Sequence, residues 1–249
     1  MIFGRNRNVR HEQIVLPDEL KDARDLEAER AVEPAGADRL GPHDAAARPD
    51  RTGYIDLGSL RVKAVQDMKL RLDVEDATQR IVAATVTLGR SALQVQAFSA
   101  PRAGGVWDGL RHELADSLAT TPGAQVQQVD GPFGPEVHTR VPAAMPDGSP
   151  GWNVARFVGV DGPRWFVRGV FHGEAAFQPE AATALEQVFS DLVVVRGDAP
   201  LPPRELLPLH PPAGAQPLQR RRRAPEAPAA AETGGSSLPE RGPEITEVR

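Results

Sequence analysis

Residues 68–98 read MKLRLDVEDATQRIVAATVTLGRSALQVQAF, and the pattern of this stretch decides the fold class. Apolar and polar residues alternate through 68–74 and again through 92–98, with the apolar run 80–88 between them. Successive side chains of a strand point to opposite faces, so this pattern predicts half-buried strands. The sequence GRS at 89–91 joins the last two and predicts a hairpin.

Two more hairpins follow along the chain. The first combines 124–130 with 135–142, and the second combines 152–160 with 164–171. Gly and Pro punctuate each turn, as hairpin loops require. Strands joined by such short turns must be antiparallel, so the sheet is expected to be mostly antiparallel.

Two segments have helical periodicity. The first ends before Pro122, and the second spans 179–191, with Pro179 suited to its first turn. A short strand over 192–196 is expected to follow. The order of elements predicts an α+β domain, a mostly antiparallel sheet flanked by two main helices. The apolar stripe of the first helix consists of Trp107, Leu110, Leu114 and Leu118.

Composition divides the chain of 249 residues into three parts. Pro and Gly contribute 24 and 23 residues and gather toward the ends, whereas all three Trp lie between residues 54 and 198. Segments with little apolar surface cannot offset the entropy of ordering the chain. We therefore predict a flexible acidic tail over 1–53, an α+β domain over 54–198, and a Pro-rich disordered tail over 199–249.

The bulk chemistry excludes several classes of protein. The chain has no cysteine, which removes disulfides, thiolate catalysis and Cys-ligated metal sites. With a formal net charge of −5, the chain lacks the overall positive field that supports non-specific nucleic-acid binding. The N-terminus shows no apolar signal region, and no window reaches the length of a membrane span. A cytoplasmic location is the resulting expectation.

No catalytic or metal motif is found in the sequence. His172 and Glu174 form the closest approach to a metal-ligand pair, but such isolated pairs are common. The serines lie outside G-x-S-x-G and S-x-x-K contexts, and Asp73 stands near a turn where Asp is favoured for structural reasons. We therefore expect no enzyme, no metal and no cofactor.

The hairpin over 152–171 carries the most unusual group of side chains. Arg164 and Arg168 are separated by an even number of residues and are expected to share a face, with Arg156 on the partner strand joining them. Trp165 and Phe171 should point into the core. The simplest interpretation is ordinary sheet patterning, with aromatics inside and arginines outside. The functional alternative is an arginine-lined groove for an acidic ligand, since guanidinium offers bidentate donors.

Beyond these patterns, the chain resembles an uncharacterised actinobacterial family of unknown function over about residues 54–210. The resemblance rests on LGSLRVKAVQDMKLRL (57–72), SALQVQAFSAPRAGGVWDGLRHEL (91–114), VDGPFGPEV (129–137), FVGVDGPRWFVRGVF (157–171) and VFSDLVVVRGDAPLPPRELLPL (188–209). It implies no known activity. The order of elements is also similar to the Mog1/PsbP-like fold, whose known members mostly bind other proteins, which implies a binding role.

Two functions remain open from the sequence. The favoured one is a non-enzymatic protein-binding or scaffold domain. The alternative is a nucleic-acid-associated accessory protein that uses the run Arg220, Arg221, Arg222 and Arg223 together with the Arg156, Arg164 and Arg168 face. A small-molecule hydrolase with a dispersed site is a third interpretation, which would require a deep polar pocket.

Overall fold

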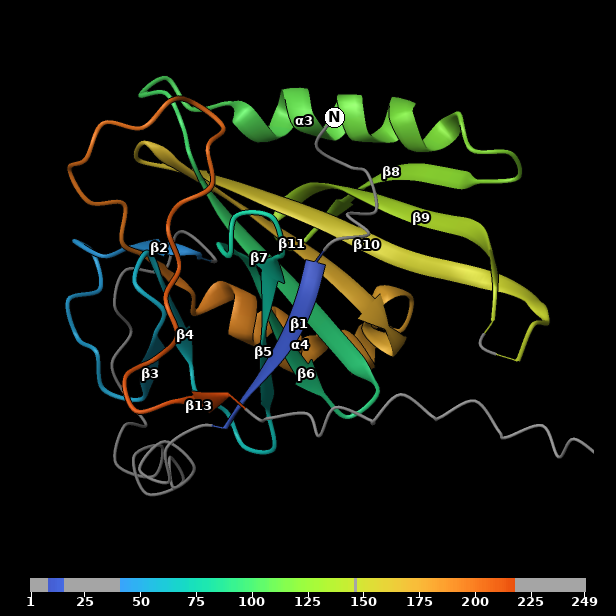
Figure 1. The fold of residues 1–249 in the computed structure, drawn as a ribbon. Coiled ribbons are helices and arrows are strands. Elements are labelled where there is room, and N and C mark those ends of the chain that lie inside the picture. The colour runs from blue at the N-terminus through green and yellow to red at the C-terminus, as the bar shows by residue number, and fades with distance from the viewer. Residues whose placement is uncertain (1–8, 16–40, 146, 218–249) are drawn as a thin grey trace, which may run out of the picture. The chain divides into compact units, whose positions relative to one another are not determined.

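The computed structural model describes residues 9–15, 41–145 and 147–217. Within these ranges, two helices and a short 3-10 helix lie against two sheets (Figure 1). The helices are α3 (Val106–Ala119) and α4 (Pro179–Ser190), and the 3-10 helix is η1 (Glu174–Ala176). The predicted α+β class, with a mostly antiparallel sheet and two main helices, is confirmed.

Nine strands form the larger sheet, and every neighbouring pair in it is antiparallel. In spatial order they are β13 (Gln216–Pro217), β1 (Val9–Val15), β5 (Lys69–Glu75), β6 (Ile81–Leu88), β7 (Ser91–Ser99), β11 (Trp165–Gly173), β10 (Pro150–Gly162), β9 (Gly134–Ala144) and β8 (Gln125–Gly131). Four short strands form the second sheet: β2 (His43–Asp44), β12 (Val193–Val194), β4 (Leu60–Lys63) and β3 (Tyr54–Asp56). The pair β12 and β2 is parallel.

The alternating patterns of the sequence became the buried and exposed faces of the central strands. Leu70 and Leu72 of β5 are fully buried on the side of α4, together with Val95 of β7. Trp165 and Phe171 of β11 are also buried there, as predicted. This side of the sheet, α4 and the smaller sheet share the main hydrophobic core.

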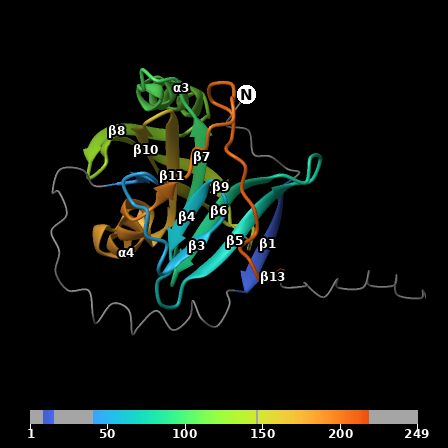
Figure 2. The same cartoon turned by 90° about the vertical axis from the view of Figure 1, so that its left-hand side faces the viewer.

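The two helices pack on opposite faces of the larger sheet (Figure 2). Two strand glycines make each approach close. An ideal Cβ on Gly159 of β10 would lie 2.3 Å from the indole of Trp107, a residue of α3. An ideal Cβ on Gly169 of β11 would lie 2.7 Å from the ring of Phe189, a residue of α4. Each glycine therefore provides the space that a helix aromatic fills.

A carboxylate from the sheet caps the beginning of α3. The backbone N–H groups of Val106 and Trp107 donate hydrogen bonds to Asp161 of β10, at 2.9 and 3.1 Å. The first N–H groups of a helix have no partner within the helix. A negative charge at this position also interacts favourably with the positive end of the helix dipole. The indole N–H of Trp107 donates to the carbonyl of Pro135 at 2.7 Å. The orientation of α3 is thus fixed from both its end and its face.

The predicted boundaries of the folded domain, 54 and 198, are too narrow. Residues before 54 contribute β2, and the Pro-rich segment after 198 packs on the core through Leu207 and Leu209. That segment also pairs with β7, because Leu207 N–H donates to the carbonyl of Ala97 at 2.9 Å. Proline removes backbone donors but leaves the intervening leucines able to bury apolar surface. The remaining parts of the predicted tails lie outside the described residues.

The close packing at Gly159 predicts opposite effects for the same substitution at two glycines. Gly159→Ala should lower the free energy of unfolding by about 1–3 kcal/mol, because the new methyl group overlaps the indole of Trp107. Gly109→Ala on α3 is the matched control. Its Cβ would meet only Arg204 Nη2 at 3.7 Å, so it should raise the stability by about 0.4–1 kcal/mol through helix propensity. Urea denaturation measures both, and equal effects would contradict the packing.

Candidate functional site

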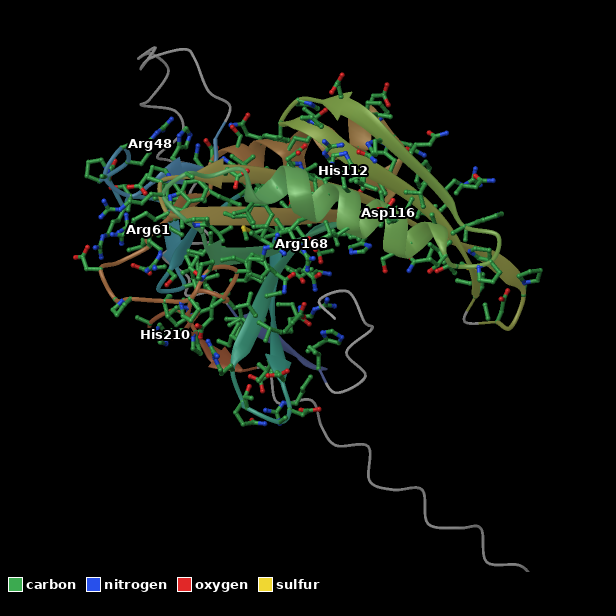
Figure 3. All side chains as sticks on the ribbon, turned by 90° about the horizontal axis from the view of Figure 1, so that it is seen from above. Arg48, Arg61, His112, Asp116, Arg168 and His210 are labelled. Atoms are coloured by element: carbon green, nitrogen blue, oxygen red, sulfur yellow. The ribbon has the colours of Figure 1, made fainter. Side chains whose placement is uncertain are left out.

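Polar side chains gather on one face of the larger sheet, next to the strands on which α3 packs (Figure 3). Strand register places them together, because directly opposite residues of antiparallel neighbours point to the same side. Three of them are cations and one is a carboxylate, so the set carries a charge of +2 with neutral imidazoles. We call this set the polar sheet face; it consists of His11, Lys69, Arg71, Asp73, Thr85, Gln94, Gln96, Arg168 and His172.

Asp73 is the buried centre of the polar sheet face, with a side chain only 1% exposed. Its Oδ1 accepts a hydrogen bond from Arg71 Nε at 3.0 Å and lies 2.7 Å from His11 Nδ1. Its Oδ2 accepts hydrogen bonds from Thr85 Oγ1 at 3.2 Å and Gln94 Nε2 at 2.7 Å. A buried charge is tolerated when it is paired and hydrogen-bonded. One carboxylate therefore fixes side chains from the four strands β1, β5, β6 and β7.

Arg168 forms the second half of the polar sheet face. It is 9% exposed, its guanidinium donates to Gln96 Oε1, and it lies 5.8 Å from the ring centroid of Phe98. Gln96 in turn donates to the carbonyl of Val82 at 2.9 Å. Burial lowers the pKa of Arg168 to about 10, so the group keeps its charge near neutral pH.

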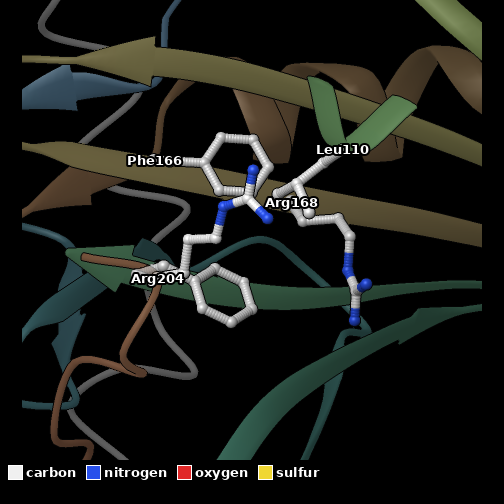
Figure 4. Close-up of a pocket in the computed structure, with 5 residues that line it drawn as sticks. Leu110, Phe166, Arg168 and Arg204 are labelled. Atoms are coloured by element: carbon white, nitrogen blue, oxygen red, sulfur yellow. The ribbon is translucent and has the colours of Figure 1, made fainter. Parts of the chain in front are cut away.

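A small pocket lies where the polar sheet face meets the apolar region under α3 (Figure 4). Its volume is about 10 Å³, which admits about one water-sized group and no metabolite. Arg204 belongs to the segment after β12 and forms an ion pair with Glu113 of α3 at 3.3 Å. The lining residues are Phe98, Leu110, Phe166, Arg168 and Arg204.

The structure does not bring Arg156, Arg164 and Arg168 to one face. Arg168 lies opposite Gly159 of β10, so Arg156, three residues away, points to the other side of the sheet. Arg164 lies in the two-residue turn between β10 and β11 with φ of 61°, and its Nη2 donates to the carbonyl of Gly197 at 2.9 Å. The expected shared arginine face was therefore wrong. A turn one residue shorter than expected changed the strand register.

Arg156 instead belongs to a buried ionic cluster on the side of α4. Its Nε and Nη2 donate to the two carboxylate oxygens of Glu136 at 2.6 and 2.9 Å, and its Nη1 donates to Glu186 of α4. Burial would raise the pKa of Glu136, but hydrogen bonds from His138 and Arg156 lower it below its ordinary value. The guanidinium also lies 4.9 Å from the ring centroid of Phe171. These contacts join α4 to the sheet, which is a structural role.

Sequence reasoning missed Asp73 as a site residue and explained it by its place before a turn. The alternation in 68–74 did place Arg71 and Asp73 on one face, which was the available signal. It could not show that His11 lies beside them, because that contact joins residues 62 positions apart. Gln94 and Gln96 also lie on the polar sheet face. The run Arg220–Arg223 lies outside the described residues.

Two kinds of feature are absent from the described part of the chain. No three His, Asp or Glu side chains in it come close enough to hold a metal ion together. None of its helices is long and apolar enough to cross a membrane.

Comparison with known proteins gives one match. Residues 41–217 match the family described as "Protein of unknown function (DUF3710)". The chain belongs to the DUF3710 family. No curated protein and no solved structure matches it. The DUF3710 match includes β5, β6, β7 and β11 of the polar sheet face, whereas β1, which supplies His11, precedes it.

The ionic cluster of this DUF3710 chain predicts a rescue between two substitutions. Arg156→Met should lower the free energy of unfolding by about 3–5 kcal/mol, because Glu136 then remains buried without its counter-charge. Adding Glu136→Gln removes that charge and should recover part of the loss. Thermal or urea unfolding of both single variants and the double variant measures the coupling. A double variant less stable than Arg156→Met would contradict the proposed cause.

Because the imidazole of His172 is largely buried, we expect the folded protein to lose stability at acidic pH. Burial is the main cause that lowers its pKa, and the nearby charge of Arg71 lowers it further while Asp73 opposes the shift. The unfolded imidazole binds its proton at about pH 6.5, above the folded pKa, so protonation favours the unfolded chain. The stability that His172 contributes is thus lost as pH falls below about 6.5.

His172→Gln should therefore flatten the dependence of stability on pH between about 7 and 5. Urea denaturation at several pH values gives this slope for the wild type and the variant. His112→Gln, on the exposed face of α3, is the control that measures the effect of removing a surface imidazole. Parallel slopes for the wild type and His172→Gln would show that His172 titrates alike in both states.

Proposed function

We propose that the chain is a non-enzymatic protein-binding domain, whose polar sheet face binds an acidic segment of a partner protein. The observation that carries the proposal is the fixed network around Asp73. It holds Arg71 and Gln94 in defined positions through hydrogen bonds of 3.0 and 2.7 Å. A surface that is already ordered loses less entropy on binding, so such pre-organised donors favour recognition.

The charge of the polar sheet face indicates which kind of partner segment it would bind. The whole chain carries −5, yet the polar sheet face carries +2 from Lys69, Arg71 and Arg168 against Asp73. The hydrogen-bonding capacity of Asp73 is engaged by neighbouring side chains, so the groups directed outward are mainly donors. Carboxylates of an acidic peptide complement such donors, and guanidinium groups bind them in a bidentate manner.

The small pocket beside the polar sheet face favours contact with a macromolecule over catalysis on a metabolite. A volume of about 10 Å³ cannot enclose a substrate, whereas drug-sized ligands occupy about 300–1,000 Å³. The similarity to Mog1/PsbP-like proteins, the actinobacterial origin and the cytoplasmic location remain predictions that accompany this proposal.

Titration with synthetic peptides tests the proposed function. An acidic twelve-residue peptide should shift backbone amide signals of β5, β6, β7 and β11 in ¹H–¹⁵N spectra of the full chain, and a neutral peptide should not. The double variant Lys69→Gln/Arg71→Gln should bind about two- to thirtyfold more weakly, since each exposed ion pair contributes about 0.2–1 kcal/mol. Arg90→Gln/Arg102→Gln makes the same charge change at exposed positions elsewhere and should bind like the wild type.

Two outcomes would reject the proposal. The first is equal weakening in both double variants, which would mean that net charge alone drives binding. The second is preference for single- or double-stranded nucleic acid with a steep dependence on salt, which would support the alternative accessory function.

A further inference from the structure

Arg61 of β4 is a buried cation in the four-stranded sheet, whereas the polar sheet face belongs to the nine-stranded sheet. Its neighbours Leu60 and Val62 point into the main core, so Arg61 points to the other side of the four-stranded sheet. Its side chain is only 5% exposed. Strand register places it between Val193 of β12 and Asp56 of β3, and Val193 is itself opposite His43.

Two nitrogen atoms of Arg61 lack a hydrogen-bond acceptor within the described part of the chain. Nε and Nη1 are both buried, and neither has a hydrogen-bond partner. The nearest carboxylate is Asp56, whose Oδ2 lies 3.9 Å from Nε, beyond hydrogen-bond distance. Asp56 is 47% exposed, and its Oδ1 already accepts the backbone N–H of Gly58 at 2.8 Å. Buried donor atoms without acceptors are costly, and Nε and Nη1 therefore point to an external anion.

Other donors lie in or beside the same small sheet as Arg61. Lys63 lies two residues along β4 and opposite Tyr54, and Arg48 lies 3.4 Å from the Nε2 atom of His43. Burial raises the pKa of Tyr54, and the charge of Asp191 raises it further, so its hydroxyl remains a donor. Arg61 and Lys63 are two residues apart on β4, and Tyr54 is directly opposite Lys63, so the three side chains share one side of the small sheet. Figure 3 shows both arginines beside the short strands.

The carboxylates near Arg61 bind groups other than Arg61. Asp44 accepts hydrogen bonds from the backbone N–H of Ala46 and the indole N–H of Trp165, at 2.9 and 2.8 Å. Asp191 forms an ion pair with Lys63 at 3.4 Å. Asp50 accepts the backbone N–H of Thr52 at 2.9 Å. Their contacts explain why none of them hydrogen-bonds Arg61.

We propose that Arg61 is the centre of a binding site for a phosphate group, either inorganic phosphate or a phosphomonoester. A phosphate group offers more oxygens than a carboxylate, so some can accept from one edge of the Arg61 guanidinium while others accept from the neighbouring donors. Lys63, Arg48 and the Tyr54 hydroxyl supply further donors. The site is independent of the polar sheet face, so either proposal can fail alone.

Arginine side-chain NMR on the full chain tests the site directly. The signal of Arg61 Nε, identified by its loss in Arg61→Lys, should shift in a saturable manner when inorganic phosphate is added at constant ionic strength. Glycerol 3-phosphate should also saturate it, and acetate should bind at least tenfold more weakly. Tighter binding of the ester would indicate a phosphomonoester ligand, and the reverse would indicate free phosphate. An Arg61 signal that moves no more than that of exposed Arg90 would overturn the proposal.

Variants give a second measurement. Arg61→Lys keeps the charge but cannot donate along two edges, so phosphate should bind at least tenfold more weakly and should lose its effect on the melting temperature. Lys63→Met changes a partly exposed side chain and should weaken binding about two- to fivefold. Arg90→Met is the matched control and should bind like the wild type. If Arg61→Lys does not fold, the Lys63→Met titration decides. Unchanged affinity in Arg61→Lys or Lys63→Met would reject the site.

Discussion

The contact of two helix aromatics with two strand glycines is the constraint on which the rest of the domain depends. Trp107 lies on Gly159 and Phe189 lies on Gly169, from opposite faces of adjacent strands. These contacts fix how close α3 and α4 come to the sheet. Trp107 also stacks on Phe166 at 6.0 Å between ring centroids, and Phe166 lines the small pocket. Interiors packed this closely transmit any change in one side chain to its neighbours.

The position of α3 also determines where the polar sheet face begins. The helix packs on β8, β9 and β10, and there the strands present apolar residues such as Phe157 and Val137. On β5, β6 and β7, the same side of the sheet carries the network around Asp73 instead. One continuous face therefore has an apolar half under a helix and a polar half beside it. The proposed binding function uses the second half, and membership of the DUF3710 family leaves its activity open.

The sequence predicted the elements of the fold because their signals are local. Alternation through 68–74 and 92–98 became β5 and β7, and the apolar stripe from Trp107 became α3. The arginine face failed because it depended on register, which the turn at Arg164 sets and composition does not. Asp73 was missed because three of its four side-chain partners, His11, Thr85 and Gln94, come from other strands. Arg61 gave no signal, since an isolated arginine between Leu60 and Val62 is what ordinary strand alternation produces.

The two ends of the described domain meet in the sheet, where β13 pairs with β1 and β1 pairs with β5. Among the residues of β1 whose exposure is described, Ile14 alone is buried, so little apolar surface opposes its departure. Opening of the domain should therefore start at this edge, ahead of the central strands. When β1 leaves, the backbone edge of β5 becomes available and Asp73 loses His11. The first step of opening therefore also changes which side chains make up the polar sheet face.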